Sequence, residues 1–559
     1  MELDLISNDK YMDTIIITLE DGSKKEYKKG IKVKEIINLL NKEDVVYATF
    51  NDSYVGYDDV LFKNGNLKLF DIYTKEGIRT YEKGLTFLFK VCALNILGKD
   101  TRIKVRHSID KGVFFEVDRS VTQEEIKEIK DDMKKMVSRN IPFIRIDTSV
   151  NEAMEYFHSI KREDKVKTLF YDKSEYVTLY KFDDVYNYII GPLPYDSSIL
   201  KYFDLTLLKD KGIILRFPSI YDNGKILKYT HHEQFFNSID EYLNWAKILN
   251  ISNVGELNDA ICNGRPGELI NLSETIQNYR LQEIASYIKD HEEDIKIVLL
   301  SGPSSSGKTT TSRKLSMYLK TFGLNPVPIS LDDYFLNRTE TPLDEYGKPD
   351  FESIRAIDVK LFNNQIGKLL KGHSILAPTF NFITGEKEFN KNIELKKNDI
   401  LVIEGLHAIS DELLTSIPRK NKYKIYISPL AYLSIDDDNR INLTDIRLLR
   451  RMVRDNRTRG YSPSHTLNNW ASVRNGEEKY IFPYQDAADV VFNTFLAYEL
   501  SVLKVYALPL LYTVKHDDPE YNTALRLIRL LDLVLPLPSE DVPSLSILRE
   551  FIGTSYFED

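Results

Sequence analysis

The chain has 559 residues, of which 42% are hydrophobic and 28% charged, and its formal net charge is −9. This composition is ordinary for a globular protein of roughly three or four domains, and the acidic balance disfavours binding of nucleic acid or membranes by overall charge. Cys92 and Cys262 provide no disulfide framework, and neither a signal peptide nor a long apolar run is evident, so we expect a cytoplasmic protein without a membrane partner.

The first part of the chain predicts a small domain rich in β-structure. Ile15–Ser23 reads as a strand that runs into a turn, and Gly30–Leu40 reads as a turn followed by an amphipathic helix. The region from about residue 12 to about residue 74 resembles the ubiquitin-like TGS domain at the start of threonyl-tRNA synthetases. We therefore assign residues 1–75 to a TGS-like domain, for which the resemblance implies a β-grasp fold.

The next region resembles the second domain of the same synthetases, the domain associated with editing. His107–Phe115 carries part of this likeness, which implies an α+β domain over residues 76–260. The editing domain normally needs a His-x-x-x-His pair and a Cys-x-x-x-His pair. Here Leu85–Cys92 occupies the first region without histidines, and no Cys-x-x-x-His occurs. We expect this domain to lack zinc ligands and aminoacyl hydrolysis.

Three histidines of this half could suggest a metal site. His231 and His232 are adjacent in the chain, so their side chains do not converge on one metal ion. His107 has no second ligand nearby at metal spacing. We interpret all three as structural or surface residues.

Two helical regions flank the central part of the second half of the chain. Residues 261–293 are predicted to form a helical linker, because Ile270–Glu293 has apolar residues at helical spacing. Residues 516–559 are predicted to form a C-terminal helical extension, with helices over Tyr521–Leu535 and Ser544–Phe551. We expect the last segment to pack back on the body, since its leucines would otherwise be exposed.

Residues 294–515 between these regions predict an α/β domain with a mainly parallel sheet. Helical or loop segments separate runs of strand length, as in βαβ units. In such sheets the chemistry lies at the carboxyl ends of the strands. The predicted strands are Ile297–Ser301, Pro326–Ser330, Ile400–Glu404 and Tyr423–Ile427.

A phosphate-binding motif follows the first of these strands. Gly302–Thr309 fits the P-loop pattern G-x-x-x-x-G-K-[ST], in which two glycines let backbone N–H groups point at phosphate oxygens. Lys308 can reach the β- and γ-phosphates, and Thr309 can hold Mg²⁺. A predicted helix over Thr310–Thr321 adds a favourable dipole. The motif predicts ATP and Mg²⁺ as ligands, with a nucleotide site made of Gly302, Ser304, Ser305, Ser306, Gly307, Lys308, Thr309 and Thr310.

Two carboxylates follow or end predicted strands beside this motif. Asp332 lies just past the second strand, where it can accept a proton from a substrate hydroxyl. Glu404 ends an apolar strand directly before Gly405, the Walker B arrangement, and with Thr309 it is predicted to hold Mg²⁺. For either carboxylate alone a helix cap or a solvated turn is the alternative, but the pair beside a P-loop favours function.

An arginine-rich segment, Asp445–Gly460, follows further along the chain. Its arginines at positions 447, 450, 451 and 454 fall at helical spacings of three and four, so they line one face. Such an array cannot pack into a core without carboxylate or phosphate partners. We favour a lid that neutralises charge on a transferring phosphoryl group, with a solvated basic face or an RNA patch as the alternative.

Taken together, these motifs make residues 294–515 resemble the uridine kinase and phosphoribulokinase group of P-loop kinases. The likeness rests on their order: Gly302–Thr309, Ser330–Asp332, Asp350–Glu352, Pro378–Phe382, Glu404–Gly405 and the arginine-rich segment. It implies an ATP-dependent kinase acting on the 5′-hydroxyl of a nucleoside. It also implies Asp332, Lys308 and Arg454 as catalytic residues, Arg451 and Arg459 at the nucleotide, and Asp332, Tyr334, Glu352, Phe380 and Arg454 at the acceptor.

Three departures from the uridine kinase pattern affect the acceptor. Asn381 stands where that pattern has an aspartate, Gly385 where it has the histidine that reads the pyrimidine, and Tyr461 where it has a lid arginine. A nucleoside, a similar sugar alcohol or a sugar phosphate therefore remain alternatives. A non-catalytic nucleotide sensor is disfavoured by retention of Lys308 and Asp332. The near-neutral front half disfavours RNA binding without excluding it, and the oligomeric state is open.

Overall fold

The computed structural model describes residues 14–42, 44–109, 111–208, 212–220, 224–230, 233–343, 347, 350–381 and 384–557. The chain forms two compact units: unit 1 comprises Met1–Thr230 and Ile435–Arg440, and unit 2 comprises His231–Ser434 and Ile441–Asp559. The interpreted residues His231, His232 and Phe382 lie outside the described residues. Within these described ranges, no helix has the length and apolar character needed to cross a membrane.

Unit 1 begins with a five-stranded mixed sheet in the order β2-β1-β7-β4-β5. Strand β1 pairs antiparallel with β2 and parallel with β7, which pairs antiparallel with β4. Helix α1 (Val33–Leu39) buries Val33, Ile36 and Ile37, as its amphipathic pattern predicts. The strands are β1 (Thr14–Thr18), β2 (Lys24–Lys28), β3 (Ile31–Lys32), β4 (Val45–Phe50), β5 (Ser53–Val55), β6 (Val60–Leu61) and β7 (Gly65–Asp71).

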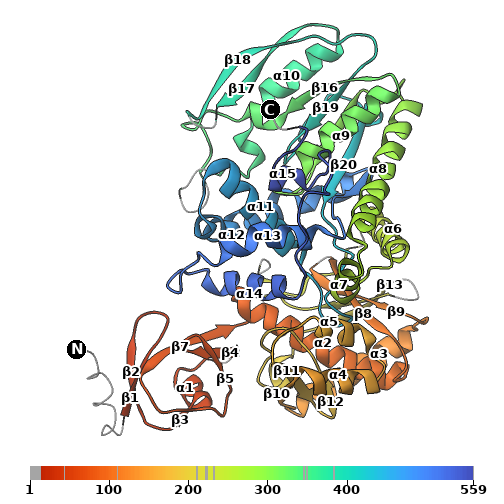
Figure 1. Ribbon diagram of the computed structural model, residues 1–559. Coiled ribbons are helices and arrows are strands. Elements are labelled where there is room, and N and C mark those ends of the chain that lie inside the picture. Colours follow the sequence, from red (N-terminus) through yellow and green to blue (C-terminus); the bar gives the residue numbers. More distant parts are fainter. Residues whose placement is uncertain are drawn as a thin grey trace. The chain divides into compact units, whose positions relative to one another are not determined.

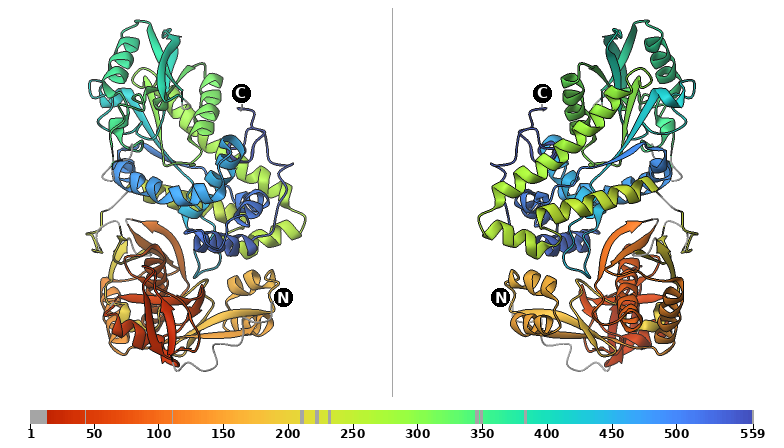
Figure 2. Two further views of the ribbon diagram at one scale, coloured as in Figure 1. Left: turned by 90° about the vertical axis from the view of Figure 1, so that its left-hand side faces the viewer. Right: turned by 90° about the vertical axis from the view of Figure 1, so that its right-hand side faces the viewer.

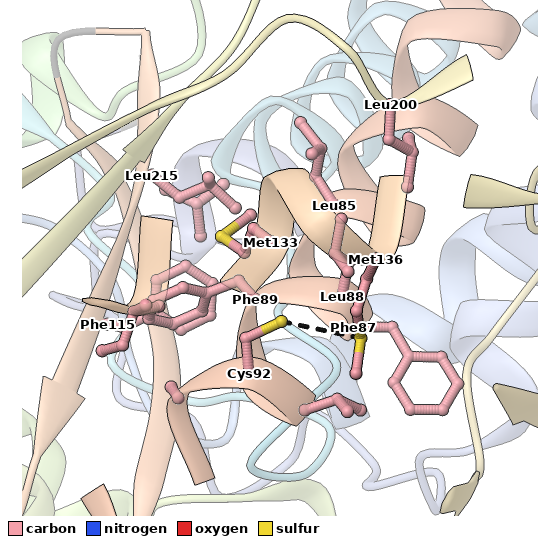
Figure 3. Close-up of a cluster of buried hydrophobic side chains, with 14 of the residues drawn as sticks. Leu85, Phe87, Leu88, Phe89, Cys92, Phe115, Met133, Met136, Leu200 and Leu215 are labelled. Carbon is pink, nitrogen blue, oxygen red and sulfur yellow. Dashed lines mark hydrogen bonds between the residues drawn. The ribbon is translucent and has the colours of Figure 1, made fainter. Parts of the chain in front are cut away.

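The rest of unit 1 is built around helix α2 (Lys75–Leu97), whose apolar side chains are buried on most sides (Figure 3). Met133 and Met136 of α3 belong to the same core, and Cys92 Sγ lies 3.7 Å from Met136 Sδ. Two antiparallel sheets, β13-β14-β9-β8 and β10-β11-β12, complete the region. The elements are β8 (Ile103–Ile109), β9 (Gly112–Val117), α3 (Gln123–Ser138), β10 (Phe143–Ser149), α4 (Val150–Ser159), α5 (Glu163–Phe170), β11 (Tyr176–Phe182), β12 (Val185–Asn187), β13 (Asp204–Leu208) and β14 (Gly212–Arg216).

Unit 2 contains a five-stranded parallel sheet in the order β16-β19-β15-β20-β21, which confirms the predicted sheet (Figure 1). Strand β15 is central, and its carboxyl end lies between those of β19 and β20. The fifth strand, β21, was not foreseen from the sequence. The strands of unit 2 are β15 (Ile297–Ser301), β16 (Asn325–Ser330), β17 (Ile375–Asn381), β18 (Glu386–Ile393), β19 (Asp399–Glu404), β20 (Lys422–Ser428) and β21 (Val490–Asn493).

The helices of unit 2 pack around this sheet, and Figure 2 shows the long helix α8 beside it. A short 3₁₀ helix, η4 (Leu331–Tyr334), follows β16. The helices are α6 (Glu233–Leu249), α7 (Val254–Cys262), α8 (Pro266–Asp290), α9 (Lys308–Thr321), α10 (Val359–Leu370), α11 (Leu443–Arg459), α12 (Pro463–Tyr480), α13 (Glu499–Leu511), α14 (Tyr521–Asp532) and α15 (Arg549–Ile552).

The structure divides the chain differently from the predicted boundaries at 260 and 293. Helix α6 belongs to unit 2, because the Tyr242 hydroxyl donates to Val491 O at 3.2 Å and accepts from Asn493 N at 2.9 Å. The predicted linker is a packed helix of the same unit: Glu274 of α8 is buried and accepts from the Tyr498 hydroxyl at 2.7 Å. The helices α6 and α8 therefore belong to the same compact unit as the parallel sheet.

The C-terminal extension packs on unit 2, as the apolar pattern predicts. Ile547, Leu548 and Phe551 are buried. The last helix is shorter than expected, since only Arg549–Ile552 is helical instead of Ser544–Phe551. Pro543–Ser546 forms a turn closed by a hydrogen bond from Ser546 N to Pro543 O at 2.9 Å, and the buried side chains after it hold the segment by tertiary packing.

Candidate active site

The P-loop connects β15 to α9 and has the backbone geometry that a phosphate cradle needs. A Cβ on Gly302 would lie 2.1 Å from Ile427 O, and Gly307 adopts φ 89°, so glycine is required at both positions. Ser305 also has positive φ, at 57°. The side-chain oxygens of Ser305 and Ser306 are buried without a partner among the described atoms. Buried, unpaired polar groups facing a glycine-rich turn fit the phosphates of a nucleotide.

Two arginines of α11 hold the outer side of this loop. Arg447 Nε donates to Ser304 O at 2.9 Å, and Arg450 Nη1 lies 3.5 Å from Ser306 O. Both side chains are buried, and each pairs with a buried carboxylate: Arg447 with Glu477 and Arg450 with Glu499. The expectation that this array needs anionic partners is confirmed, but the partners of these two arginines are carboxylates. Arg447 and Arg450 therefore brace the loop and do not form a lid.

The other predicted lid arginines gather on one carboxylate that the sequence reasoning missed. Asp455 is buried and accepts from Arg454 Nη2 at 2.7 Å, while Arg451 Nε and Arg459 Nη1 lie 3.3 Å and 3.5 Å from its oxygens. Arg451 Nη1 also donates to Ser304 Oγ at 2.7 Å. The spacing of four residues on either side of Asp455 was a signal that could have identified this cluster. The structure brings Arg451, Arg454 and Arg459 together, and their roles at phosphate stay predictions.

The charges of Glu404 and Asp332, the carboxylates expected at the strand ends, act on the P-loop lysine Lys308. Burial lowers the pKa of Lys308, and Glu404 and Asp332 act against this shift by their charge. The residue Asp332 is exposed, but desolvation of its carboxylate by neighbouring groups raises its pKa, an effect that the charge of Lys308 opposes. The pKa of Glu404 is raised to about 7, mainly because the carboxyl group is buried and secondly because Asp332 carries a like charge nearby. Perturbed groups gathered at one P-loop are typical of a catalytic site.

Ser330 links the two strand ends. Its hydroxyl donates to Glu404 Oε1 at 3.2 Å and accepts from the backbone N–H of Asp332 at 3.3 Å. This contact caps η4 and holds Asp332 just beyond β16. The hydroxyl of Thr309 and the carboxylate of Glu404 are the hard oxygen donors that suit Mg²⁺, and these residues would hold it. Among the described residues, no group of three or more His, Cys, Asp or Glu side chains is placed to hold a metal ion.

Glu352 lies in the same electrostatic environment. The pKa of Glu352 is raised to about 7, mainly by burial and secondly by the negative charge of Glu477. The positive charges of Arg451 and Lys308 lower this pKa but do not cancel the shift. Its position beside Glu477, Arg451 and Lys308 fits the predicted acceptor site.

His407 was not singled out from the sequence. Burial lowers the pKa of His407 to about 4, so this imidazole is neutral near pH 7.

The structure corrects the assignment of Tyr334 to the acceptor site. Tyr334 is 1% exposed, its hydroxyl donates to Gln365 Oε1 at 2.8 Å, and its ring packs edge-on against Phe362. The tight turn of η4 buries Tyr334 while leaving Asp332 accessible. Phe380 is largely buried beside Phe335, and its contact with an acceptor stays a prediction.

Gly385, which we predict to stand where the uridine kinase pattern has a histidine, lies beside Arg338. Gly385 has φ 78°, and a Cβ built on it would lie 2.8 Å from Arg338 Cβ and 2.9 Å from Arg338 Nε. Arg338 N donates to Gly385 O at 2.8 Å, and Gly385 N donates to Asn381 O at 2.7 Å. A side chain larger than glycine at position 385 would therefore collide with Arg338.

The C-terminal segment adds one carboxylate to the site that the sequence did not reveal. Glu550 Oε2 accepts from the backbone N–H of Thr310, in the first turn of α9, at 3.2 Å. The side chain of Arg457 holds this segment through the carbonyls of Glu550 and Phe551 at 3.2 Å and 3.3 Å. The Glu550 carboxylate thus binds a backbone N–H group at the N-terminus of α9, a position where phosphate groups also bind.

Comparison with known proteins agrees with this geometry. Residues 297–500 match the Phosphoribulokinase / Uridine kinase family. The C-terminal part of the chain is a P-loop kinase domain of this type. It is similar to the uridine kinase of Staphylococcus haemolyticus, with 26% identity over 196 residues that cover 35% of this chain and 86% of that protein. The uridine kinase of Bacillus pumilus is 25% identical over 214 residues, 37% of this chain and 93% of its own.

Among solved structures, a possible uridine kinase from Bacillus stearothermophilus is also similar to part of this kinase domain. The two share 18% sequence identity, with a TM-score of 0.26, over 38% of this chain and all of that chain (100%).

Proposed function

We propose that this protein transfers the γ-phosphoryl group of ATP to a hydroxyl of a nucleoside or a similar sugar alcohol. The observation that carries the proposal is that Ser330 connects Asp332 and Glu404 at the carboxyl ends of β16 and β19, next to the strand β15 that leads into the P-loop with Lys308. Phosphoryl transfer requires positioning and charge stabilisation more than covalent chemistry, and this set of groups provides both.

Each group has a distinct part in this proposal. Asp332, held just beyond the end of β16 by Ser330, takes the proton of the acceptor hydroxyl. Lys308 and the arginines beside Asp455 stabilise negative charge on the phosphoryl group. Mg²⁺, when bound, neutralises charge on the phosphates, and Thr309 and Glu404 would hold it. Glu352 accepts hydrogen bonds from hydroxyl groups of the acceptor and so orients the acceptor in the site.

The identity of the acceptor rests on two opposing observations. The relatives named above are uridine kinases, which favours a nucleoside. A second candidate is a sugar phosphate, because the family that matches residues 297–500 includes phosphoribulokinase as well as uridine kinase. Glu352 suits the hydroxyls of either acceptor.

For unit 1 we propose a TGS-like region followed by an editing-like region without zinc chemistry. The mixed sheet with α1 supports the first assignment. The second rests on the resemblance already described, and Leu85–Cys92 of α2 packs into an apolar core. Zinc analysis of the purified full chain tests this part, since stoichiometric zinc would contradict it.

The decisive experiment is an acceptor panel with ATP and Mg²⁺, in which ADP release is measured. Uridine, cytidine, adenosine, guanosine and several sugar phosphates are compared with a reaction that lacks acceptor. Release with nucleosides alone supports the first candidate, and release with sugar phosphates alone supports the second. ATP binding without turnover of any acceptor would contradict the kinase proposal.

A further inference from the structure

Helix α12 holds one residue of the P-loop through a buried carboxylate. Glu477 of this helix is 0% exposed, and its Oε1 accepts from the backbone N–H of Ser304 at 3.1 Å. Arg447 Nη1 and Arg474 Nη1 each donate to Glu477 Oε2 at 2.9 Å. Arg447 Nε also donates to Ser304 O at 2.9 Å, so the Arg447–Glu477 pair binds both backbone groups of Ser304.

The residue before Glu477 touches the side chain of Glu352. A Cβ built on Gly476 would lie 2.5 Å from Glu352 Cβ and 2.7 Å from Glu352 Cγ. Glu352 Cβ is bonded directly to the backbone, so rotation of the Glu352 side chain cannot move this atom away. Glycine weakens the interior of a helix, but it allows close approach of another segment. Only glycine at position 476 therefore lets Glu352 lie this close to α12.

Tyr480 lies one helical turn beyond Gly476, on the same face of α12. Its hydroxyl donates to Asp350 Oδ2 at 2.9 Å, and Asp350 Oδ1 accepts from the backbone N–H of Glu352 at 3.2 Å. The imidazole of His407 packs edge-on against the Tyr480 ring, with 6.3 Å between the ring centroids. Tyr480 and Gly476 together determine where the turn with Glu352 lies relative to α12.

The two contacts of α12 differ in strength. At the P-loop, one buried carboxylate binds two guanidinium groups and a backbone N–H group. At the turn, one hydrogen bond from Tyr480 and contact with Gly476 hold Glu352, and the neighbouring Phe351 is 43% exposed. Separating buried charges costs more than shifting a partly exposed turn. A change between α12 and Glu352 should therefore displace the turn and leave the P-loop in place.

We propose that α12 positions the acceptor carboxylate Glu352 relative to the P-loop. Glu477 is the positioning residue at the nucleotide, and Gly476 and Tyr480 are the positioning residues at the acceptor. The acceptor oxygen must come within about 3–3.5 Å of the phosphorus atom for transfer, so the separation of the two sites affects the rate. The inference rests on the proposed function, in which Glu352 binds the acceptor, and adds three residues that act through Ser304 and Glu352.

Gly476→Ala tests the close approach, and Gly367→Ala is its matched control. Gly367 also lies inside a helix, α10, but a Cβ there would enter open space. A crystal structure of Gly476→Ala should show Glu352 Cβ about 1 Å further from α12, because carbon atoms pack at about 3.5–4 Å. The contact between Glu477 and Ser304 should be unchanged. Affinity for Mg·ATP, measured at equilibrium without acceptor, should stay within about twofold of the wild type for both variants.

Kinetics separate positioning from a loss of stability. The nucleosides and sugar phosphates of the acceptor panel serve as probes, and thermal unfolding is recorded in parallel. Gly476→Ala and Tyr480→Phe should raise KM for the acceptor by about tenfold or more and leave KM for ATP within about twofold, because a misplacement of about 1 Å costs up to about 100-fold. In a Glu352→Gln background, Gly476→Ala should raise KM for the acceptor no further.

Glu477→Gln tests the contact with the P-loop. It preserves the shape of the side chain but removes the charge shared by Arg447 and Arg474, so Mg·ATP binding should weaken by about tenfold or more. Wild-type ATP affinity of Glu477→Gln, an unmoved Glu352 in the Gly476→Ala structure, or equal acceptor KM in Gly476→Ala and Gly367→Ala would overturn the proposal. If the structure and the Mg·ATP affinities are as expected but no acceptor is phosphorylated, only the proposed function is contradicted.

Discussion

Replacing Arg450 with methionine should destabilise unit 2 strongly. The guanidinium is fully buried: Nε lies 3.0 Å from Glu499 Oε1, Nη2 lies 2.6 Å from Glu499 Oε2, and Nη2 also donates to Thr494 O at 2.8 Å. Methionine retains most of the apolar stem but leaves the Glu499 carboxylate buried without its partner. Breaking a buried ion pair from one side costs about 3–5 kcal/mol. That is a large share of the roughly 5–15 kcal/mol that stabilises a typical domain.

The assay is guanidinium-induced unfolding followed by circular dichroism. The control is Arg265→Met, since Arg265 pairs with Glu268 at 2.8 Å and both side chains are more than half exposed. Such a pair contributes about 0–1 kcal/mol, so the control should unfold close to the wild type. The double variant Arg450→Met, Glu499→Leu should recover part of the loss, because it buries no lone charge. If Arg450→Met unfolds at the same midpoint as Arg265→Met, the bracing role is refuted.

Four further predictions concern the site. Lys308→Ala should abolish phosphoryl transfer, because a main charge at the γ-phosphate is lost, and normal turnover of a folded variant would contradict the kinase proposal. Asp332→Asn should keep ATP binding but slow ADP release by roughly 10²–10⁴-fold; an unchanged rate would exclude it as the base. Because the pKa of Glu404 is raised to about 7, its carboxylate ionises as pH rises through that value, so Mg²⁺ affinity should increase from about pH 6 to about pH 8. Titration of Glu404→Gln with Mg²⁺ should show a flatter pH dependence; an equally steep one would point to another ligand. Glu550→Gln removes negative charge from the N-terminus of α9 and should tighten ATP binding by a factor of roughly two to five, whereas weaker binding would show that Glu550 supports the nucleotide.

Raised carboxyl pKa values also affect stability. The pKa of Glu352 and Glu404 rises from 4.5 to about 7 on folding, so the folded chain holds these protons more tightly than the unfolded chain. Their contribution to the free energy of unfolding is therefore fully present below about pH 4.5 and is lost as pH rises through about 7. Ionisation of these two carboxyl groups, which is completed above about pH 7, therefore lowers the stability of the fold.

Local patterns were sufficient to locate the kinase elements. The four predicted strands of the parallel sheet occur within one residue of their observed bounds, because buried parallel strands are continuous apolar runs. The P-loop was also readable, since its glycines and lysine are required by short-range geometry at set spacings. Strand ends then indicated Asp332 and Glu404, because parallel strands bring their carboxyl ends to one edge.

What the sequence determined by itself was thus the set of groups that follow from local conformation: the P-loop, the strand-end carboxylates and the arginine face of α11. Only the tertiary structure decided the partners of these groups. Arg447 and Arg450 turned inward because Glu477 and Glu499 neutralise them, Tyr334 entered the core, and Glu550 reached α9 from a distance of 240 residues in sequence. The placement of Ile435–Arg440 in unit 1, while its neighbours in sequence belong to unit 2, also depends on such distant partners. A charged residue is buried only where distant parts of the chain supply the opposite charge, and such long-range pairing leaves no periodic trace in the sequence.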